Sequence, residues 1–241
     1  MISRHGIVRT IVASALALGG MIAAPASAAD VDQRSVARGG RLYDKWYKEI
    51  KVDAPTVSHP LYPAANEKYA KDPASNWRCK ECHGWDRQGA AGGYAKGSHA
   101  TGIIGIDGMS GGDPAAVIAI LTSEGHGYGD KLSQQDLADL ANFVVYGKVE
   151  WPAYIDPETK EPKGNAEAGK QVFNTICANC HGLEGKLPKE MPPLASLMSN
   201  PWEVMHKILN GQPNEAMPAL RAIDNQVAAD ILAHLKTLPE Q

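Results

Sequence analysis

The sequence predicts an all-α protein built as two similar domains in tandem. A five-residue motif occurs twice, each copy lies between two segments with helical periodicity, and a segment rich in proline and charge separates the copies. At 241 residues with 44% hydrophobic content, the chain is long enough for two small domains. We divide it into a leader at 1–29, a first domain at 30–147, a linker at 148–165 and a second domain at 166–241.

Residues 1–29 have the composition of a secretory signal peptide. Arg4 and Arg9 precede an apolar run over residues 11–24, and small residues follow it. The run is shorter than the roughly 20 apolar residues of a membrane span, and no later segment is apolar enough to be one. We therefore expect the leader to be removed and the mature protein to be periplasmic, without an integral membrane span.

All four cysteines fall in two copies of the pattern C-x-x-C-H, "CKECH" at 79–83 and "CANCH" at 177–181. This is the haem c attachment pattern, because on a short helical turn both sulfurs can form thioethers to a porphyrin while the adjacent imidazole reaches the iron. A zinc site would crowd these ligands into one tetrahedron, and a redox dithiol does not need the histidine. A disulfide is the ordinary use of paired cysteines in an exported chain, but it would leave the repeated histidine unexplained.

The motifs therefore predict two covalently bound haem c groups. The expected attachment residues are Cys79, Cys82, Cys177 and Cys180, and the expected proximal iron ligands are His83 and His181.

A helix with the same marker residues precedes each motif. In "SVARGGRLYDKWYKEI" Gly39 lies four positions before Tyr43, and in "NAEAGKQVFNTI" Gly169 lies four positions before Phe173. Apolar residues at helical spacing surround both pairs. These segments are expected to be equivalent helices.

A second amphipathic helix follows each motif. "SQQDLADLANFVVYG" begins with Ser133 and "DNQVAADILAHLKTL" begins with Asp224, and both residue types cap helices. Aligning the two caps places Leu140 on Ile231, so the expected core faces coincide.

With these motifs and helices, the chain resembles two class I c-type cytochrome domains in tandem. Double-domain dihaem cytochromes of the cytochrome c4 kind are the family it is most similar to. The resemblance covers the whole mature chain and implies that each domain is wrapped around one covalent haem c.

The sixth iron ligand of the second haem is expected in "NEAMPAL". Met217, followed by proline and seven residues before Asp224, looks like the methionine loop of class I cytochromes. A thioether opposite His181 raises the potential of the iron. The other methionines of this half, Met191, Met198 and Met205, are the alternatives.

The same offset in the first half leads to a histidine. The position seven residues before Ser133 is His126, in the glycine-rich loop "TSEGHGYGD". We therefore expect His83 and His126 to ligate the first haem, which departs from the cytochrome c4 pattern of methionine on both irons. Met109, His99 and a vacant position are the alternatives.

The first half also carries an insertion at residues 44–78. Tyr43 lies 36 positions before Cys79, whereas Phe173 lies 4 positions before Cys177. Loops of this length are usually functional or disordered. The insertion can cover the first haem, form a partner surface or shape a pocket.

We expect an electron carrier without catalytic residues, in which haem one has the lower potential and haem two the higher. Redox proteins are the expected partners, and the mild net charge of −3 gives no reason to expect nucleic acid. The alternative is a dihaem oxidoreductase acting on a small inorganic substrate at haem one, similar to thiosulfate dehydrogenases. That family uses a further cysteine at the active-site iron, and here all four cysteines are committed to attachment.

Overall fold

The computed structural model describes residues 31–241, so the predicted signal peptide at 1–29 lies outside the described residues. Within the described range the chain is helical and contains no strand, only isolated bridges between Gly89 and Ile104 and between Ile155 and Pro162. The predicted all-α class is confirmed. None of the helices described at 31–241 is long and apolar enough to cross a membrane.

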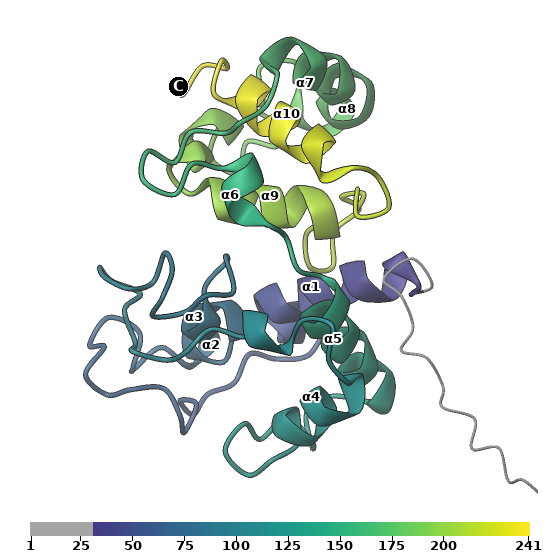
Figure 1. Ribbon diagram of the computed structural model, residues 1–241. Helices are drawn as coiled ribbons and strands as arrows, with labels where there is room; N and C mark the ends of the chain where they lie inside the picture. Colours follow the sequence, from purple (N-terminus) through teal and green to yellow (C-terminus); the bar gives the residue numbers. More distant parts are fainter. Residues whose placement is uncertain (1–30) are drawn as a thin grey trace, which may run out of the picture.

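The first half folds around a helix pair. Its elements are α1 (Gln33–Glu49), α2 (Pro73–Asn76), α3 (Cys79–His83), η2 (Asp107–Met109), α4 (Pro114–Leu121) and α5 (Gln134–Tyr146). Helix α1 crosses α5, and α4 lies on the far side of α5, as Figure 1 shows. The short α3 contains the whole first cysteine motif, so the motif is helical, as its proposed chemistry requires.

The second half repeats this plan. Its elements are α6 (Trp151–Tyr154), α7 (Ala166–Val172), η3 (Phe173–Cys177), α8 (Ala178–His181), η4 (Leu194–Ser199), α9 (Pro201–Asn210) and α10 (Asn225–Leu235). The segment predicted as a linker, 148–165, contains the short helix α6. Val149, Trp151 and Ile155 are buried in the core of the second half.

The two helix crossings use equivalent residues. A methyl group on Gly39 would lie 2.0 Å from the carbonyl oxygen of Asp139, and one on Gly169 would lie 1.9 Å from that of Asp230. Only glycine permits this approach in both halves. Asp139 lies six positions after Ser133, and Asp230 lies six positions after Asp224, so the two aspartates occupy equivalent places in the aligned helices. The predicted alignment of the repeat is therefore confirmed.

The predicted helix caps are also confirmed. The Ser133 hydroxyl accepts from the backbone N–H of Asp136, and the Asp136 carboxylate accepts in return from the N–H of Ser133, forming a capping box. Asp224 accepts from the N–H of Gln226 at the start of α10. Both closing helices therefore begin where the sequence indicates.

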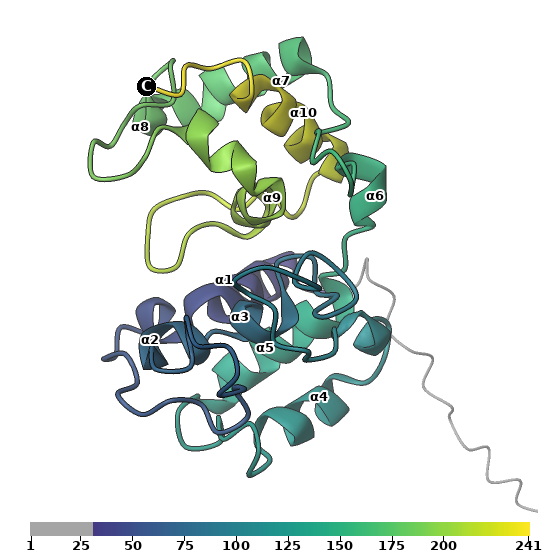
Figure 2. The same cartoon turned by 90° about the vertical axis from the view of Figure 1, so that its left-hand side faces the viewer.

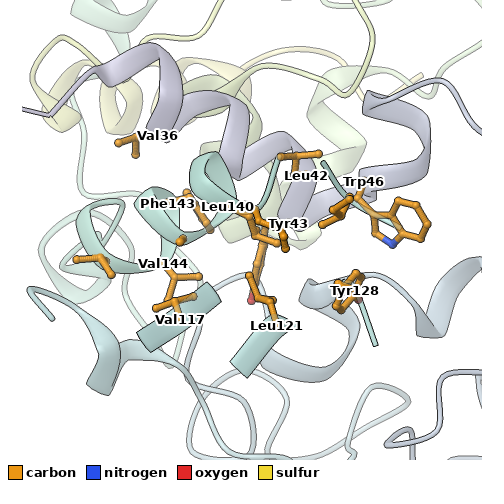
Figure 3. Close-up of a cluster of buried hydrophobic side chains, with 14 of the residues drawn as sticks. Val36, Leu42, Tyr43, Trp46, Val117, Leu121, Tyr128, Leu140, Phe143 and Val144 are labelled. Carbon is orange, nitrogen blue, oxygen red and sulfur yellow. The ribbon is translucent and has the colours of Figure 1, made fainter. Parts of the chain in front are cut away.

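Each half has its own buried core. The labelled core residues of the first half in Figure 3 come from α1, α4, α5 and the loop before α5, and they include Tyr43, Leu140 and Phe143. The second core gathers Phe173, Ile231 and residues of α9. Residues 31–241 therefore contain two hydrophobic centres, and each is built around one crossing of helices.

The halves meet through α1 and α9, which face each other in both ribbon views (Figures 1 and 2). The buried His206 donates its Nε2–H to the carbonyl oxygen of Gly40 at 2.9 Å, and Lys207 Nζ lies 2.7 Å from a carboxylate oxygen of Asp44. Asp44 also pairs with Arg78. Burial alone would raise the pKa of Asp44, but the charges of Lys207 and Arg78 outweigh it and hold that pKa well below its usual value.

Candidate haem-attachment sites

Both cysteine motifs end in the same backbone turn. Gly84 has φ 79° and ψ 161°, and Gly182 has φ 70° and ψ 159°, a conformation that other residues rarely adopt. The N–H of Gly84 donates to the carbonyl of Lys80, and that of Gly182 donates to the carbonyl of Ala178. Each motif is therefore a single helical turn closed by glycine directly after its histidine.

The histidines of the two motifs are held by the same hydrogen bond. His83 Nδ1 lies 2.8 Å from the carbonyl oxygen of Ile104, and His181 Nδ1 lies 3.1 Å from that of Leu187. Because a carbonyl only accepts, Nδ1 carries the proton in both rings and Nε2 keeps its lone pair. This is the arrangement of an imidazole whose Nε2 binds a metal.

The four thiols are not paired with one another. All four cysteines are free, and no disulfide joins either pair. Burial raises the pKa of Cys79 to about 11 and that of Cys82 to about 12, and it also raises the pKa of Cys177. A redox dithiol needs a lowered thiol pKa, so the surroundings of the pairs do not favour that alternative.

Large apolar side chains beside each motif are exposed. Ile104 is 78% exposed, and in the second half Leu183 is 67% and Leu187 44% exposed. Ile104 and Leu187 are the residues whose carbonyls hold the histidines. An apolar ring system placed against each histidine would cover such side chains, so the surface around both motifs fits a porphyrin.

On the distal side of the first motif, His126 is half-buried, and no hydrogen bond engages its ring among the described residues. Burial lowers its pKa. The pKa of His83 is lowered first by burial, and the charge of His126 lowers it further. The ring of His126 is therefore not committed by a hydrogen bond to another side chain among the described residues, which is what the predicted ligand requires.

The other first-half candidates are engaged elsewhere. The imidazole of His99 has its Nδ1 2.5 Å from the buried carboxylate of Glu81, and its ring is stacked between Tyr69 and Tyr94 with centroids 4.8 Å away on each side. Met109 packs against the first hydrophobic core at the end of η2. Of the three candidates, His126 has the least engaged side chain.

In the second half, the four methionines differ in burial. Met205 is fully buried and Met198 is 7% exposed, and both fill the second core. Met217 and Met191 are partly buried and lie against that core from surface loops. Only these two have the partial exposure expected of a side chain at the edge of a crevice.

Sequence reasoning missed how the insertion contacts the loop that carries His126. His59 is 6% exposed, its Nε2–H donates to the backbone carbonyl of His126 at 3.2 Å, and its Nδ1 accepts from the N–H of Leu61 at 3.2 Å. The hydroxyl of Tyr128 donates to the carbonyl of Trp77 at 2.9 Å. The insertion therefore holds the loop that carries His126. Its histidine and tryptophan were visible in the sequence, but their partners were not.

A polar cluster within the first motif was also missed. Lys80 and Glu81 are buried inside "CKECH" and pair at 2.6 Å. The nearby Tyr62 hydroxyl is buried and has no hydrogen-bond partner among the described residues. The corresponding positions of "CANCH" are uncharged, so the two motifs differ in their electrostatic surroundings.

Comparisons with known proteins bear mainly on the second half. Residues 164–235 match the model of the family described as cytochrome C oxidase, cbb3-type, subunit III. No curated protein matches the chain. Among solved structures it is similar to a chain of the Kuenenia stuttgartiensis reducing HAO-like protein complex, with 14% identity, 77% of this chain and 99% of that chain covered, and a TM-score of 0.28. A score this low does not establish a shared fold.

The matched segment contains the second motif, its histidine and Met217. Residues 164–235 thus match a cytochrome c domain, which implies a covalently bound haem c and electron transfer for this segment of the chain.

Proposed function

We propose that the protein is an exported dihaem cytochrome that passes single electrons between redox proteins. The observation that carries this proposal is the repeated histidine geometry. Two motifs 98 residues apart present an imidazole with Nδ1 bonded to a carbonyl and Nε2 available. A second haem at Cys79 and Cys82 is proposed on the same grounds as the haem at Cys177 and Cys180.

The chain supplies a different distal residue in each half. His126 would oppose His83, and Met217 would oppose His181. The bound iron supplies reversible one-electron chemistry, and its potential depends on the axial ligands and on burial. Since a thioether raises the potential relative to an imidazole, the first half would hold the lower-potential centre and the second half the higher.

A second candidate is an oxidoreductase for a small inorganic substrate at the first haem. It is favoured by a groove of about 1100 Å³ between the halves, lined by residues such as Trp85, Tyr94, His99 and Trp202. Trp85 lies two residues after His83, so the groove reaches the surroundings of the first motif. An open iron position in the first half would support this candidate, and two saturated irons would support the carrier.

The ligand assignment is tested by a redox titration of the purified holoprotein and of Met217→Leu. We expect the substitution to lower the midpoint potential of one haem and to leave the other unchanged. Met191→Leu is the matched control, because this methionine also lies partly buried against the second core. An unchanged titration of Met217→Leu, or a shift in the control, would contradict the assignment.

Export is a separate part of the proposal. The composition of residues 1–29 supports cleavage and a periplasmic location. Sequencing of the mature N-terminus tests it: a start near Asp30 is expected, and an intact leader on holoprotein in the cytoplasm would contradict it.

A further inference from the structure

The loop that carries Met217 rests on the other half of the molecule. Residues 211–217 follow α9, and Figure 2 shows the yellow-green loop after α9 reaching toward α1. The backbone N–H of Asn214 donates to Glu49 Oε2 at 2.9 Å, although the two residues are 165 positions apart. Glu49 is the last residue of α1, so the first half holds the tip of this loop.

The base of the loop is held by the same helix. Arg41 Nη1 donates to the carbonyl oxygen of Asn210 at 3.0 Å. The next residue, Gly211, has φ 85°, and a methyl group there would lie 2.8 Å from the carbonyl oxygen of Met217. The loop therefore closes on itself at Met217, between two contacts with α1.

The side chain of Glu49 is also held by two arginines of its own helix. Its side chain is 7% exposed, and Oε1 lies 2.9 Å from Arg41 Nη2 and 3.8 Å from Arg38 Nε. Oε2 accepts from Asn214, a residue in the left-handed conformation at φ 53°. A carboxylate oriented by two guanidinium groups gives a charge-assisted hydrogen bond with a defined direction. The neighbouring pair of Lys48 and Glu215 is exposed, so we assign it little weight.

We propose that the first half positions the distal ligand of the second haem, with Glu49 as the positioning residue. This inference rests on the proposed function, because it takes Met217 as that ligand. The methionine is held by a loop whose tip and base are bonded to α1. Release of the tip removes one charged hydrogen bond and lets the loop open away from the haem.

The experiment compares holoprotein carrying Glu49→Ala or Glu49→Gln with the unmodified chain. The readouts are the red charge-transfer absorption of methionine-ligated ferric haem and the rate at which added imidazole displaces the methionine. We expect Glu49→Ala to raise that rate about tenfold, as the loss of one charged hydrogen bond allows. Glu49→Gln keeps an acceptor oxygen for the Asn214 N–H and should restore most of the difference. Glu67→Ala, an exposed glutamate of the first half, is the matched control.

The location of the effect separates positioning from general damage. Glu49 belongs to the first half, so a merely structural defect would disturb the first haem and the unfolding transition of that half. The proposal requires the change to appear at the second haem, with the first-haem spectrum unchanged. Equal displacement rates in Glu49→Ala and the unmodified chain would overturn it.

The proposed function can fail separately from this inference. If Met217→Leu leaves the red absorption unchanged, Met217 is not the ligand and the proposed function is wrong at that point. If Met217→Leu abolishes the red absorption while both Glu49 variants behave as the unmodified chain, Met217 is the ligand. In that case the positioning role of Glu49 is wrong.

Discussion

The two halves share their proximal side and differ on the distal side. In the first half the carbonyl that holds the motif histidine comes 21 residues later, at Ile104, and in the second half it comes 6 residues later, at Leu187. Both loops nevertheless deliver the same bond, and the same glycine turn follows each histidine. The candidate distal ligands are His126, whose loop is hydrogen-bonded to the insertion, and Met217, whose loop is hydrogen-bonded to the other half.

This difference indicates that the proposed chemistry requires the same attachment geometry in both halves and allows the distal residue to vary. Attachment and proximal ligation need one local geometry, so the repeat retains it despite unequal loop lengths. The distal residue and its cover set the potential, so variation there can give two unlike centres in one chain.

The largest effect is expected from removal of one attachment pair. The double variant Cys177→Ser and Cys180→Ser removes both thioether-forming sulfurs of the second half and should reduce the haem content from about two per chain to about one. Mass spectrometry with haem staining measures this. The matched variant at Cys79 and Cys82 should lose the other haem. Loss of all haem from one variant alone would mean that only one motif is functional.

The next effect concerns the distal ligand of the first half. His126→Ala should convert the first haem from low spin to high spin, since no imidazole then opposes His83, while the second haem keeps its spectrum. Electron paramagnetic resonance measures the conversion, and His99→Ala is the matched control. A low-spin first haem in His126→Ala would exclude this histidine as the ligand.

A smaller effect is expected at the contact between the halves. Asp44 is 2% exposed and pairs with Lys207 and Arg78, so Asp44→Asn removes a buried charge that two cations share. We expect a loss of about 3 kcal/mol in the free energy of unfolding, measured by denaturant titration. A loss below 1 kcal/mol would mean that the two halves are not held together by this cluster.

At neutral pH the smallest effect is the pH dependence at the same contact, which develops only on acidification. Burial lowers the pKa of His206 to about 3, below the unfolded value of about 6.5. The unfolded chain therefore takes up the proton first, and stability present above about pH 6.5 declines as the pH falls toward the folded pKa. His206→Phe should reduce the slope of stability against pH by about 1.4 kcal/mol per unit in that range. An identical slope in both proteins would show that His206 is not kept neutral.

The repeated parts of the molecule could be predicted from the sequence because they depend on local patterns. Gly39 and Gly169 identified equivalent helices, and Ser133 and Asp224 identified the helix starts, since repeated patterns and caps depend on residue type and spacing. That the two glycines lie at the helix crossings is shown only by the structure. Met217 was predicted from the proline that follows it, and its offset from Asp224 then led to His126; both ligands remain predictions.

The supports of the distal loops could not be predicted in this way. His59 reaches the carbonyl of His126 across 67 positions, and Glu49 reaches Asn214 across 165. No spacing rule connects residues so far apart, because their contact depends on how the elements pack. The packing of the linker segment could not be predicted for the same reason: its proline and charge indicate a connection, and they do not show that Trp151 and Ile155 are buried in the second core.

The measurement that tests the account most directly is the low-temperature electron paramagnetic resonance spectrum of the oxidised holoprotein. It distinguishes axial ligand sets and spin states without a substrate or a partner. The account predicts two low-spin signals of equal weight, one of the bis-histidine type and one of the histidine–methionine type. Two identical signals, or a high-spin signal from either haem, would contradict it.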